Sequence, residues 1–191
     1  KMGYAIAKAF RNAGAAVNLV SGPVNLTPPY GIEISHVKSA QEMFEKTKSL
    51  FGSADIILYV AAVADYAAKN IADIKIKKKD DDLSIDLERT TDIAGTFGHL
   101  KKSHQIAVGF ALETNDALEN AIKKVVKKNF DFIVLNSLQD KGAGFLYDTN
   151  KIKIVHPSGV IKDFELKSKD EVAIDILNEV KMLIENRRKY V

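Results

Sequence analysis

Lysine side chains gather at two places in the sequence where regular backbone geometry would put their charges on one face. Lys75, Lys77 and Lys79 alternate within one polar segment, so an extended chain would place their three ammonium groups on the same side. Lys124 and Lys128 are four residues apart, which makes them neighbours on a helix. Compact positive fields of this kind suit phosphate groups. Lysines also protect edge strands and cover solvated helix faces, so the spacing alone leaves both interpretations open.

Small and acidic residues follow the most apolar segment of the chain, residues 56–64. If that segment is a strand, Ala61, Ala62 and Asp65 lie near its carboxyl end, where open α/β sheets bind ligands. The alanines would let a ligand approach the backbone, and Asp65 would accept hydrogen bonds from a base or a ribose. Phe110 closes another apolar segment, and its ring could stack on a base. Alternatively, the two alanines only pack against their neighbours, Asp65 caps a turn and Phe110 belongs to the core.

Composition narrows the class of protein. The 191 residues are 46% hydrophobic and 28% charged with a net charge of +3, which fits one globular domain and gives no indication of a nucleic-acid partner. The absence of cysteine excludes disulfides and thiolate metal sites, and the four histidines lack metal-ligand spacing. The longest apolar run is far shorter than the roughly 20 residues of a membrane span. We therefore expect a cytoplasmic protein without membrane association and without a metal site built from its own side chains.

Helical and strand patterns alternate along the chain, which predicts a Rossmann-like α/β fold with a doubly wound, mostly parallel sheet. A polar stretch at residues 66–90 reads as an insertion or arm, and we treat residues 1–191 as a single domain. A hairpin is expected near the C-terminus, across residues 157–159. Helices are expected at residues 2–13, 39–50, 91–101, 116–128 and from 169, and strands at 16–20, 32–37, 56–64, 106–111 and 131–137.

Taken in order, short motifs along the chain resemble the phosphopantothenate–cysteine ligase family, also called phosphopantothenoylcysteine synthetase. The likeness covers nearly the whole chain in the motifs KMGYAIA, GAAVNLVSGPV, AAVADY, KIKK, TDIA, VGFALET, DFIVLNS and GF. It implies a ligase of coenzyme A biosynthesis that joins 4′-phosphopantothenate to L-cysteine through an acyl-cytidylate made from CTP, with Mg²⁺ accompanying the nucleotide. In bacteria this activity is usually the C-terminal half of a fusion with a flavin-dependent decarboxylase, so FMN would belong only to a fused decarboxylase domain.

The resemblance also implies roles for individual residues. Lys75 matches the first lysine of a K-x-K-K flap that closes over the reacting phosphate, and is the expected catalytic residue. Lys124 and Lys128 match the pair that holds the triphosphate, and Phe110 matches the phenylalanine that contacts the nucleotide. The full set implied to bind the nucleotide is Ala61, Ala62, Asp65, Lys75, Thr91, Asp92, Ile93, Ala94, Phe110, Lys124 and Lys128.

The sequence departs from the family pattern in two places. Thr90-Thr91 stands where the family has Asn-Pro. The family's T-N-x-S-S-G segment, with the first strand and glycine-rich turn before it, has no counterpart within residues 1–191, so we expect a fold without its first strand. A protein limited to these residues is therefore predicted to be poorly stable and unable to form product. The family also implies a homodimer formed partly through the arm, and fusion or association with phosphopantothenoylcysteine decarboxylase.

Two other functional classes share this fold. An NAD(P)-dependent oxidoreductase is the first, although residues 20–22, Val-Ser-Gly, offer no acidic side chain for an adenosine ribose. A nucleotide-binding or assembly module that lacks a complete catalytic site is the second. Nucleotide preference and pyrophosphate release distinguish the three hypotheses.

Overall fold

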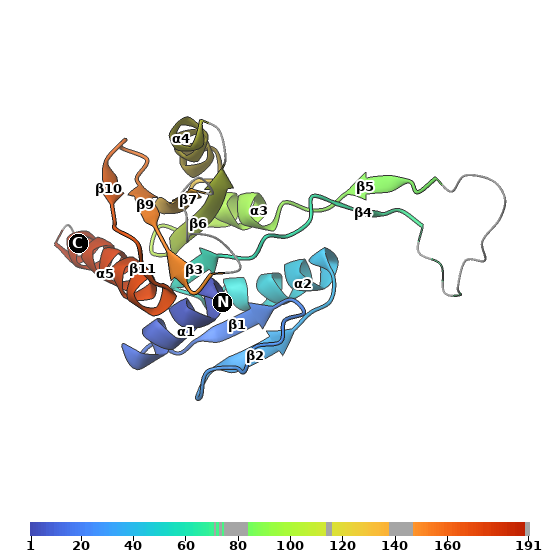
Figure 1. Cartoon of the computed structure of the whole chain (residues 1–191), viewed down its shortest axis with the longest axis horizontal. Coiled ribbons are helices and arrows are strands. Elements are labelled where there is room, and N and C mark those ends of the chain that lie inside the picture. The colour runs from blue at the N-terminus through green and yellow to red at the C-terminus, as the bar shows by residue number, and fades with distance from the viewer. Residues whose placement is uncertain (71, 73, 75–83, 114–115, 138–146, 190–191) are drawn as a thin grey trace.

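A computed structural model of the chain describes residues 1–70, 72, 74, 84–113, 116–137 and 147–189. Helices and strands alternate through most of this length, as Figure 1 shows. The helices are α1 (Met2–Asn12), α2 (Ala40–Phe51), α3 (Ile93–Leu100), α4 (Ala117–Lys127) and α5 (Lys169–Arg188). The strands are β1 (Asn18–Ser21), β2 (Glu33–His36), β3 (Ile56–Tyr59), β4 (Tyr66–Ala68), β5 (Leu87–Arg89), β6 (Ile106–Glu113), β7 (Phe132–Ser137), β8 (Thr149–Asn150), β9 (Ile152–Val155), β10 (Ile161–Asp163) and β11 (Lys167–Ser168).

The main sheet has five strands in the order β10-β9-β7-β6-β3. Strands β3, β6 and β7 run parallel, whereas β9 is antiparallel to β7 and β10 is antiparallel to β9. The expected C-terminal hairpin is therefore confirmed, and it extends the parallel sheet with two antiparallel strands. Strands β1 and β2 form a separate parallel pair. This is the mostly parallel α/β fold that the sequence predicts.

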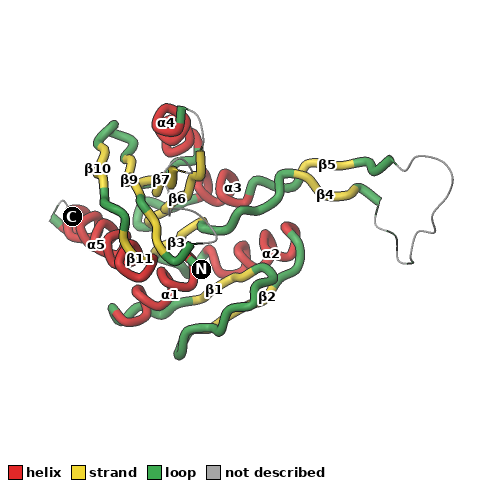
Figure 2. The backbone as a smooth tube through the Cα atoms, in the orientation of Figure 1, coloured by secondary structure: helices red, strands yellow, loops and turns green. Residues whose placement is uncertain are grey.

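Helices cover both faces of the main sheet (Figure 2). The side chains of β6 therefore alternate between two apolar clusters, one on each face. Ile106 and Val108 pack toward α1 and α5, which contact each other. Ala107 and Ala111 point the other way, toward Val125 of α4. Buried residues of β7 divide between the same two clusters. Strands covered on both faces are continuously apolar, which explains why β6 and β7 are recognisable from sequence.

Strand β3 differs from its prediction as a long central strand. It covers only Ile56–Tyr59 and lies at the edge of the five-stranded sheet, paired with β6 alone among the described strands. Its side chains are half-buried, and the chain after Tyr59 leaves the sheet as a loop. The central, fully covered positions belong to β6 and β7. Apolarity thus predicted the strand but not its place in the sheet.

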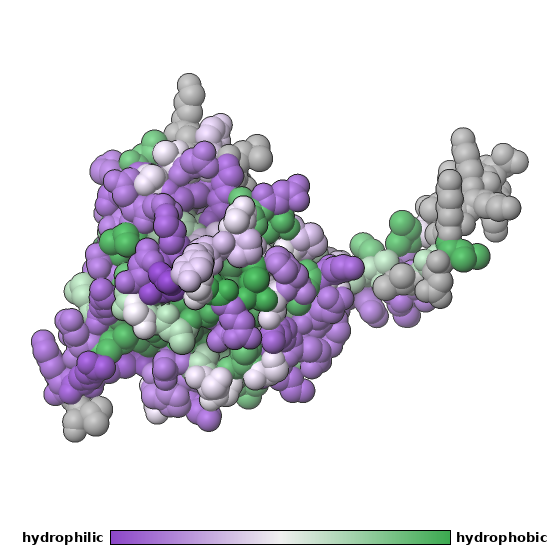
Figure 3. All heavy atoms as spheres, turned by 90° about the horizontal axis from the view of Figure 1, so that it is seen from below, coloured by the Kyte–Doolittle hydropathy of each residue, from purple (hydrophilic) through white to green (hydrophobic). Residues whose placement is uncertain are grey.

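Strands β4 and β5 pair antiparallel and project away from the body of the molecule (Figure 1). Apolar side chains on this hairpin remain in solvent: Tyr66 is 52% exposed and Leu87 is 61% exposed. Green patches on the projecting part of Figure 3 show the same feature. No helix among the described residues is long and apolar enough to cross a membrane.

Helix α5 begins with a capping box that fixes the position of its first residue. The Ser168 hydroxyl accepts a hydrogen bond from the Glu171 backbone N–H at 3.3 Å, and the Glu171 carboxylate accepts one from the Ser168 N–H at 2.9 Å. Strand β11, which ends at Ser168, pairs with β8. Lys169 is therefore held directly beside β8, at the carboxyl side of the main sheet.

Candidate functional site

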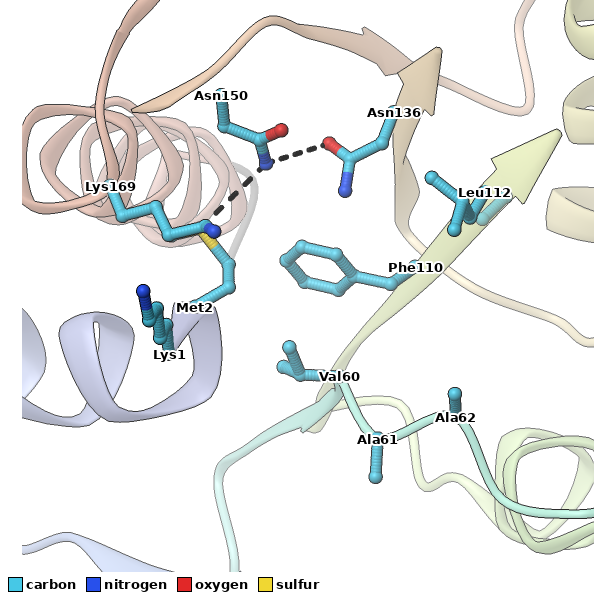
Figure 4. Close-up of a pocket in the computed structure, with 11 residues that line it drawn as sticks. Lys1, Met2, Val60, Ala61, Ala62, Phe110, Leu112, Asn136, Asn150 and Lys169 are labelled. Atoms are coloured by element: carbon cyan, nitrogen blue, oxygen red, sulfur yellow. Dashed lines mark hydrogen bonds between the residues drawn. The ribbon is translucent and has the colours of Figure 1, made fainter. Parts of the chain in front are cut away.

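A hollow opens where the carboxyl ends of β3, β6 and β7 meet the first residues of α1 and α5 (Figure 4). The sequence predicts a ligand at this edge, and the structure gathers residues from six elements or their flanking loops there. They are Lys1, Met2, Val60, Ala61, Ala62, Phe110, Ala111, Leu112, Asn136, Asn150 and Lys169. We call this set the β6–β7 hollow.

Three residues that the resemblance assigns to the nucleotide meet in this hollow. Ala61 and Ala62 follow β3 and are exposed, so a ligand can approach their backbone. Phe110 is half-buried on β6 and packs against the cluster beneath α1 and α5. Its ring faces the hollow in Figure 4. The geometry is compatible with a base or another flat group lying over the ring.

A second group of predicted residues lies at the start of α3. Asp92 caps this helix, and its Oδ1 accepts a hydrogen bond from the Gly95 N–H at 3.0 Å. The Lys128 ammonium lies 2.8 Å from the same oxygen. We call Asp92 and Lys128 the α3–α4 cluster, and Lys124 lies about one helical turn earlier, on α4. The sequence proposed Asp92 and Lys128 separately, and the structure shows them as an ion pair.

Thr90 ties this cluster to the loop after β3. Its hydroxyl donates to the Ala64 carbonyl at 2.6 Å, and its N–H donates to the Asp65 carbonyl at 3.0 Å. Asp65 and Thr91 are both exposed beside this connection. A threonine where the family has asparagine therefore still anchors the loop, through a side-chain bond to the backbone.

The pKa of Asp92 reflects competition between two effects. Partial burial would raise the pKa of this carboxyl, but the hydrogen bond and charge of Lys128, together with the Gly95 N–H, hold it below its ordinary value. Asp92 is consequently ionised at neutral pH and pairs with Lys128. The Asp92 side chain is 59% exposed, so the pair lies in high dielectric and contributes little to stability.

The side chains of Ile93 and Ala94 pack inside the protein, so they are not placed to contact a nucleotide. Ile93 is 7% exposed and belongs to the core, and Ala94 packs against the cluster beneath α4. Only backbone groups of these two residues, at the N-terminus of α3, are placed to face a ligand. Lys75 lies outside the described residues.

Lys124 and Lys128 belong to the opposite side of the sheet from the Phe110 ring. Phe110 packs toward α1 and α5, whereas α4 covers the other face. Lys128 nevertheless reaches the carboxyl edge because its side chain extends to Asp92 at the start of α3. A ligand that touches both groups must therefore bridge the edge of the sheet.

Close backbone packing holds Lys128 in place. A Cβ built on Gly98 would lie 1.9 Å from the Lys128 carbonyl oxygen, so only glycine fits where α3 crosses the end of α4. The Asn129 side-chain amide donates to the Gly98 carbonyl at 2.9 Å. Gly109 makes a similar approach to the Phe130 ring, and that ring stacks on Tyr59 with centroids 5.6 Å apart.

Besides Lys1, three polar residues of the β6–β7 hollow are absent from the sequence-based set: Asn136, Asn150 and Lys169. The Asn150 amide donates to Asn136 Oδ1 at 2.9 Å, and the Lys169 ammonium donates to the Tyr147 carbonyl. They come from β7, β8 and α5. Their spacing along the sequence does not predict that Asn136, Asn150 and Lys169 meet.

With this geometry in place, comparison with known proteins identifies the family. The family model described as the DNA/pantothenate metabolism flavoprotein C-terminal domain matches residues 1–183. The chain belongs to this family. Coenzyme A biosynthesis bifunctional protein CoaBC of Bacillus subtilis (strain 168) is 44% identical over 184 residues, covering 96% of this chain and 45% of that protein. A protein from an unspecified prokaryote, named cysteine/cysteine sulfinic acid decarboxylase, is 46% identical over 185 residues, covering 96% of this chain and 52% of that protein.

Solved structures of the flavoprotein C-terminal domain family show the same architecture. The crystal structure of the C-terminal domain of a Coenzyme A biosynthesis bifunctional protein CoaBC matches with a TM-score of 0.81 at 39% identity, covering 97% of this chain and 84% of that one. The chain spans about half the length of the curated relatives it matches. A relative's full name therefore does not say which activity resides in the matched half.

Proposed function

We propose that this chain carries phosphopantothenate–cysteine ligase activity in coenzyme A biosynthesis, with CTP as the activating nucleotide. The observation that supports it best is the hollow beside Phe110 at the carboxyl ends of β3, β6 and β7, together with the Asp92–Lys128 ion pair at the start of α3. Relatives named as coenzyme A biosynthesis bifunctional proteins match nearly all of this chain. A solved structure of the C-terminal domain of a protein of that name also matches, and the family resemblance places the ligase in that half.

In the first half-reaction, the carboxylate of 4′-phosphopantothenate attacks the α-phosphate of CTP and pyrophosphate leaves. Negative charge grows on the α-phosphate and on the departing oxygens, so positioned cations are the main help that a protein can give. Lys128 and Lys124 would hold the triphosphate, while the Asp65 loop contacts the ribose. Because the Asp92–Lys128 pair lies at the surface, an incoming triphosphate can draw the ammonium away from Asp92 at low cost.

In the second half-reaction, the amine of L-cysteine attacks the acyl carbon and CMP leaves, which forms the amide. Lys75 would act on the reacting phosphate from the 66–90 segment. Mg²⁺ would accompany the nucleotide: the described residues contain no group of three or more acidic or histidine side chains that could hold a metal ion, so the phosphates would supply most of its ligands.

A homodimer and a fused or associated decarboxylase complete the proposal. The exposed apolar side chains of the β4–β5 hairpin support the dimer, because large apolar groups held in solvent at a projecting element mark interaction surfaces. FMN would belong only to the decarboxylase.

The experiment that tests the function is pyrophosphate release dependent on 4′-phosphopantothenate, measured with CTP and with ATP, followed by detection of the cysteine amide. In a protein extended upstream through a strand and a T-N-x-S-S-G-like segment, we expect turnover with CTP and tighter binding of CTP than of ATP by calorimetry. Equal or tighter ATP binding would contradict the assignment of the base. Binding of NADP or NAD in preference to both would favour the oxidoreductase alternative, and nucleotide binding without pyrophosphate release would favour the assembly module.

A further inference from the structure

Asn136, Asn150 and Lys169 form a polar wall of the β6–β7 hollow to which the proposed nucleotide contacts give no task. They come from three different elements, β7, β8 and the first turn of α5, and all three line the hollow. Their neighbours in the hollow include the apolar side chains of Met2 and Phe110. A polar wall inside an apolar cavity fixes the orientation of a ligand.

Asn150 is the most deeply placed member of this wall. It is 1% exposed, its Nδ2 donates to Asn136 Oδ1 at 2.9 Å, and its Oδ1 has no hydrogen-bond partner in the described part of the chain. Burying an amide with an unsatisfied oxygen opposes folding, so apolar packing alone does not explain an asparagine here. What Asn150 provides is a fixed hydrogen bond to Asn136.

That bond determines what Asn136 presents to the hollow. Because the oxygen of Asn136 accepts from Asn150, its amide nitrogen points into the space beside the Phe110 ring (Figure 4). An amide nitrogen is a donor only. Asn136 therefore offers a preset N–H to an acceptor group in the hollow.

Lys169 places a positive charge on the same space. The residue is only 7% exposed, and Figure 4 shows its side chain directed into the hollow. Desolvation, followed by the nearby charge of Lys1, lowers the pKa of this ammonium, and the charge of Asp148 opposes the shift only in part. An anion in the hollow would offset the lost hydration. A cation and an N–H donor that converge on one cavity match the two oxygens of a carboxylate.

We propose that Lys169 and Asn136 form a carboxylate subsite that holds the carboxylate of L-cysteine, and that Asn150 is a positioning residue for Asn136. This inference rests on the proposed ligase function. The second reactant, 4′-phosphopantothenate, also has a carboxylate, but that group must attack phosphorus, and an ion pair with a lysine would weaken it as a nucleophile. The carboxylate of cysteine takes no part in bond formation. The apolar side chains of Met2 and Phe110 suit a small thiol side chain beside it.

The test compares L-cysteine with cysteamine, which is the same amine and thiol without the carboxylate. We expect the wild-type protein to prefer cysteine in kcat/KM, and Lys169→Met to reduce that preference by about tenfold to hundredfold through cysteine alone, as expected for an ionic hydrogen bond. Pyrophosphate release in the absence of cysteine should stay unchanged. Lys8→Met is the matched control, because the Lys8 ammonium pairs with Asp170 at 2.9 Å on the surface.

The positioning part is tested with Asn136→Ala, Asn150→Leu and the double variant. Each single variant should reduce the cysteine preference, and the double variant should reduce it no further, because Asn150 acts only through Asn136. A merely structural Asn150 would change stability and leave the ratio of the two substrates intact. An unchanged ratio in Lys169→Met and Asn136→Ala would overturn the subsite, and so would a slowed first half-reaction with the ratio preserved.

A binding measurement separates failure of the subsite from failure of the ligase proposal. The side-chain amide resonances of Asn136 are followed in ¹⁵N-labelled protein as L-cysteine or cysteamine is added. A shift with cysteine and none with cysteamine supports the subsite even if no pyrophosphate is released. Equal responses to both, or none to either, overturn it even if the protein proves to be the ligase.

Discussion

The α3–α4 cluster and the β6–β7 hollow hold their lysines in opposite ways. The Lys128 ammonium lies at the surface, 2.8 Å from a carboxylate that is 59% exposed. Lys169 is 7% exposed, its ammonium donates to the Tyr147 carbonyl, and the charges of Lys1 and Asp148 lie nearby. A surface ion pair exchanges partners readily, which suits a phosphate chain that must bind and leave. A desolvated lysine among fixed neighbours is preorganised for one anion, which suits discrimination between similar substrates.

The largest effect is expected from Gly98→Ala, which tests whether the close packing of α3 on the end of α4 holds Lys128 in place. The new methyl would lie 1.9 Å from the Lys128 carbonyl oxygen. That oxygen belongs to the backbone and cannot move aside like a flexible side chain, so α3 and the end of α4 must separate. We expect a loss of about 3 kcal/mol in the free energy of unfolding, measured by urea denaturation, together with weaker nucleotide binding.

Gly52→Ala is the control for that variant. Gly52 has a φ of −65° and nothing within 4 Å of its ideal Cβ position. Alanine there should leave stability unchanged or raise it by about 0.4–1 kcal/mol. If the two alanine variants were equally stable, the contact between α3 and α4 would not be what holds Lys128.

The next effect concerns nucleotide affinity. Lys128→Ala should weaken CTP binding by about 1.5–3 kcal/mol, the usual contribution of a hydrogen bond to a charged group, measured by titration calorimetry. Lys123→Ala is its control, because the Lys123 ammonium pairs with Glu119 on the exposed face of the same helix. Equal losses in both variants would mean that α4 attracts the nucleotide only through its overall charge.

Lys75 gives a contrasting expectation that follows from the family resemblance. A lysine that acts from a flap mainly in the transition state should, when changed to alanine, lower kcat more than it weakens CTP binding. Lys128→Ala should show the reverse pattern. The division between binding and chemistry fails if the two variants behave alike.

The smallest effect is the pH dependence that the Asp92–Lys128 ion pair gives to the stability of the protein. The pKa of Asp92 is lower in the folded protein, so its contribution to stability is present above the unfolded value of about 3.9 and is lost as pH falls through the folded value. Thermal unfolding at about pH 5 and about pH 3 should show this loss, at most about 1 kcal/mol for an exposed pair. The loss should shrink in Lys128→Ala. An unaltered acid dependence would show that the Gly95 N–H and the cap, rather than Lys128, stabilise the carboxylate.

Local features of the fold were predictable because they depend on neighbours in the sequence. A helix was expected at residues 39–50, and Ser39 caps α2 because its hydroxyl accepts from the Glu42 N–H at 3.1 Å. In a capping box the Glu42 carboxylate would accept from the Ser39 N–H. Here it accepts from the Lys38 N–H instead. Helix α4 and strands β6 and β7 follow the apolar periodicity closely. Hydrogen bonds within a turn and the period of a helix are local, so the sequence determines them directly.

The arrangement of the site was decided only by tertiary structure. Asp92 and Lys128 form a pair across 36 positions, and Asn136 meets Asn150 across 14. These contacts depend on the order of strands in the sheet and on which face each side chain enters, and both result from burial summed over the whole chain. The spacing of Lys124 and Lys128 was visible in the sequence. The buried Lys169 and the amides of Asn136 and Asn150 became a candidate site only because β7, β8 and α5 meet in the folded chain.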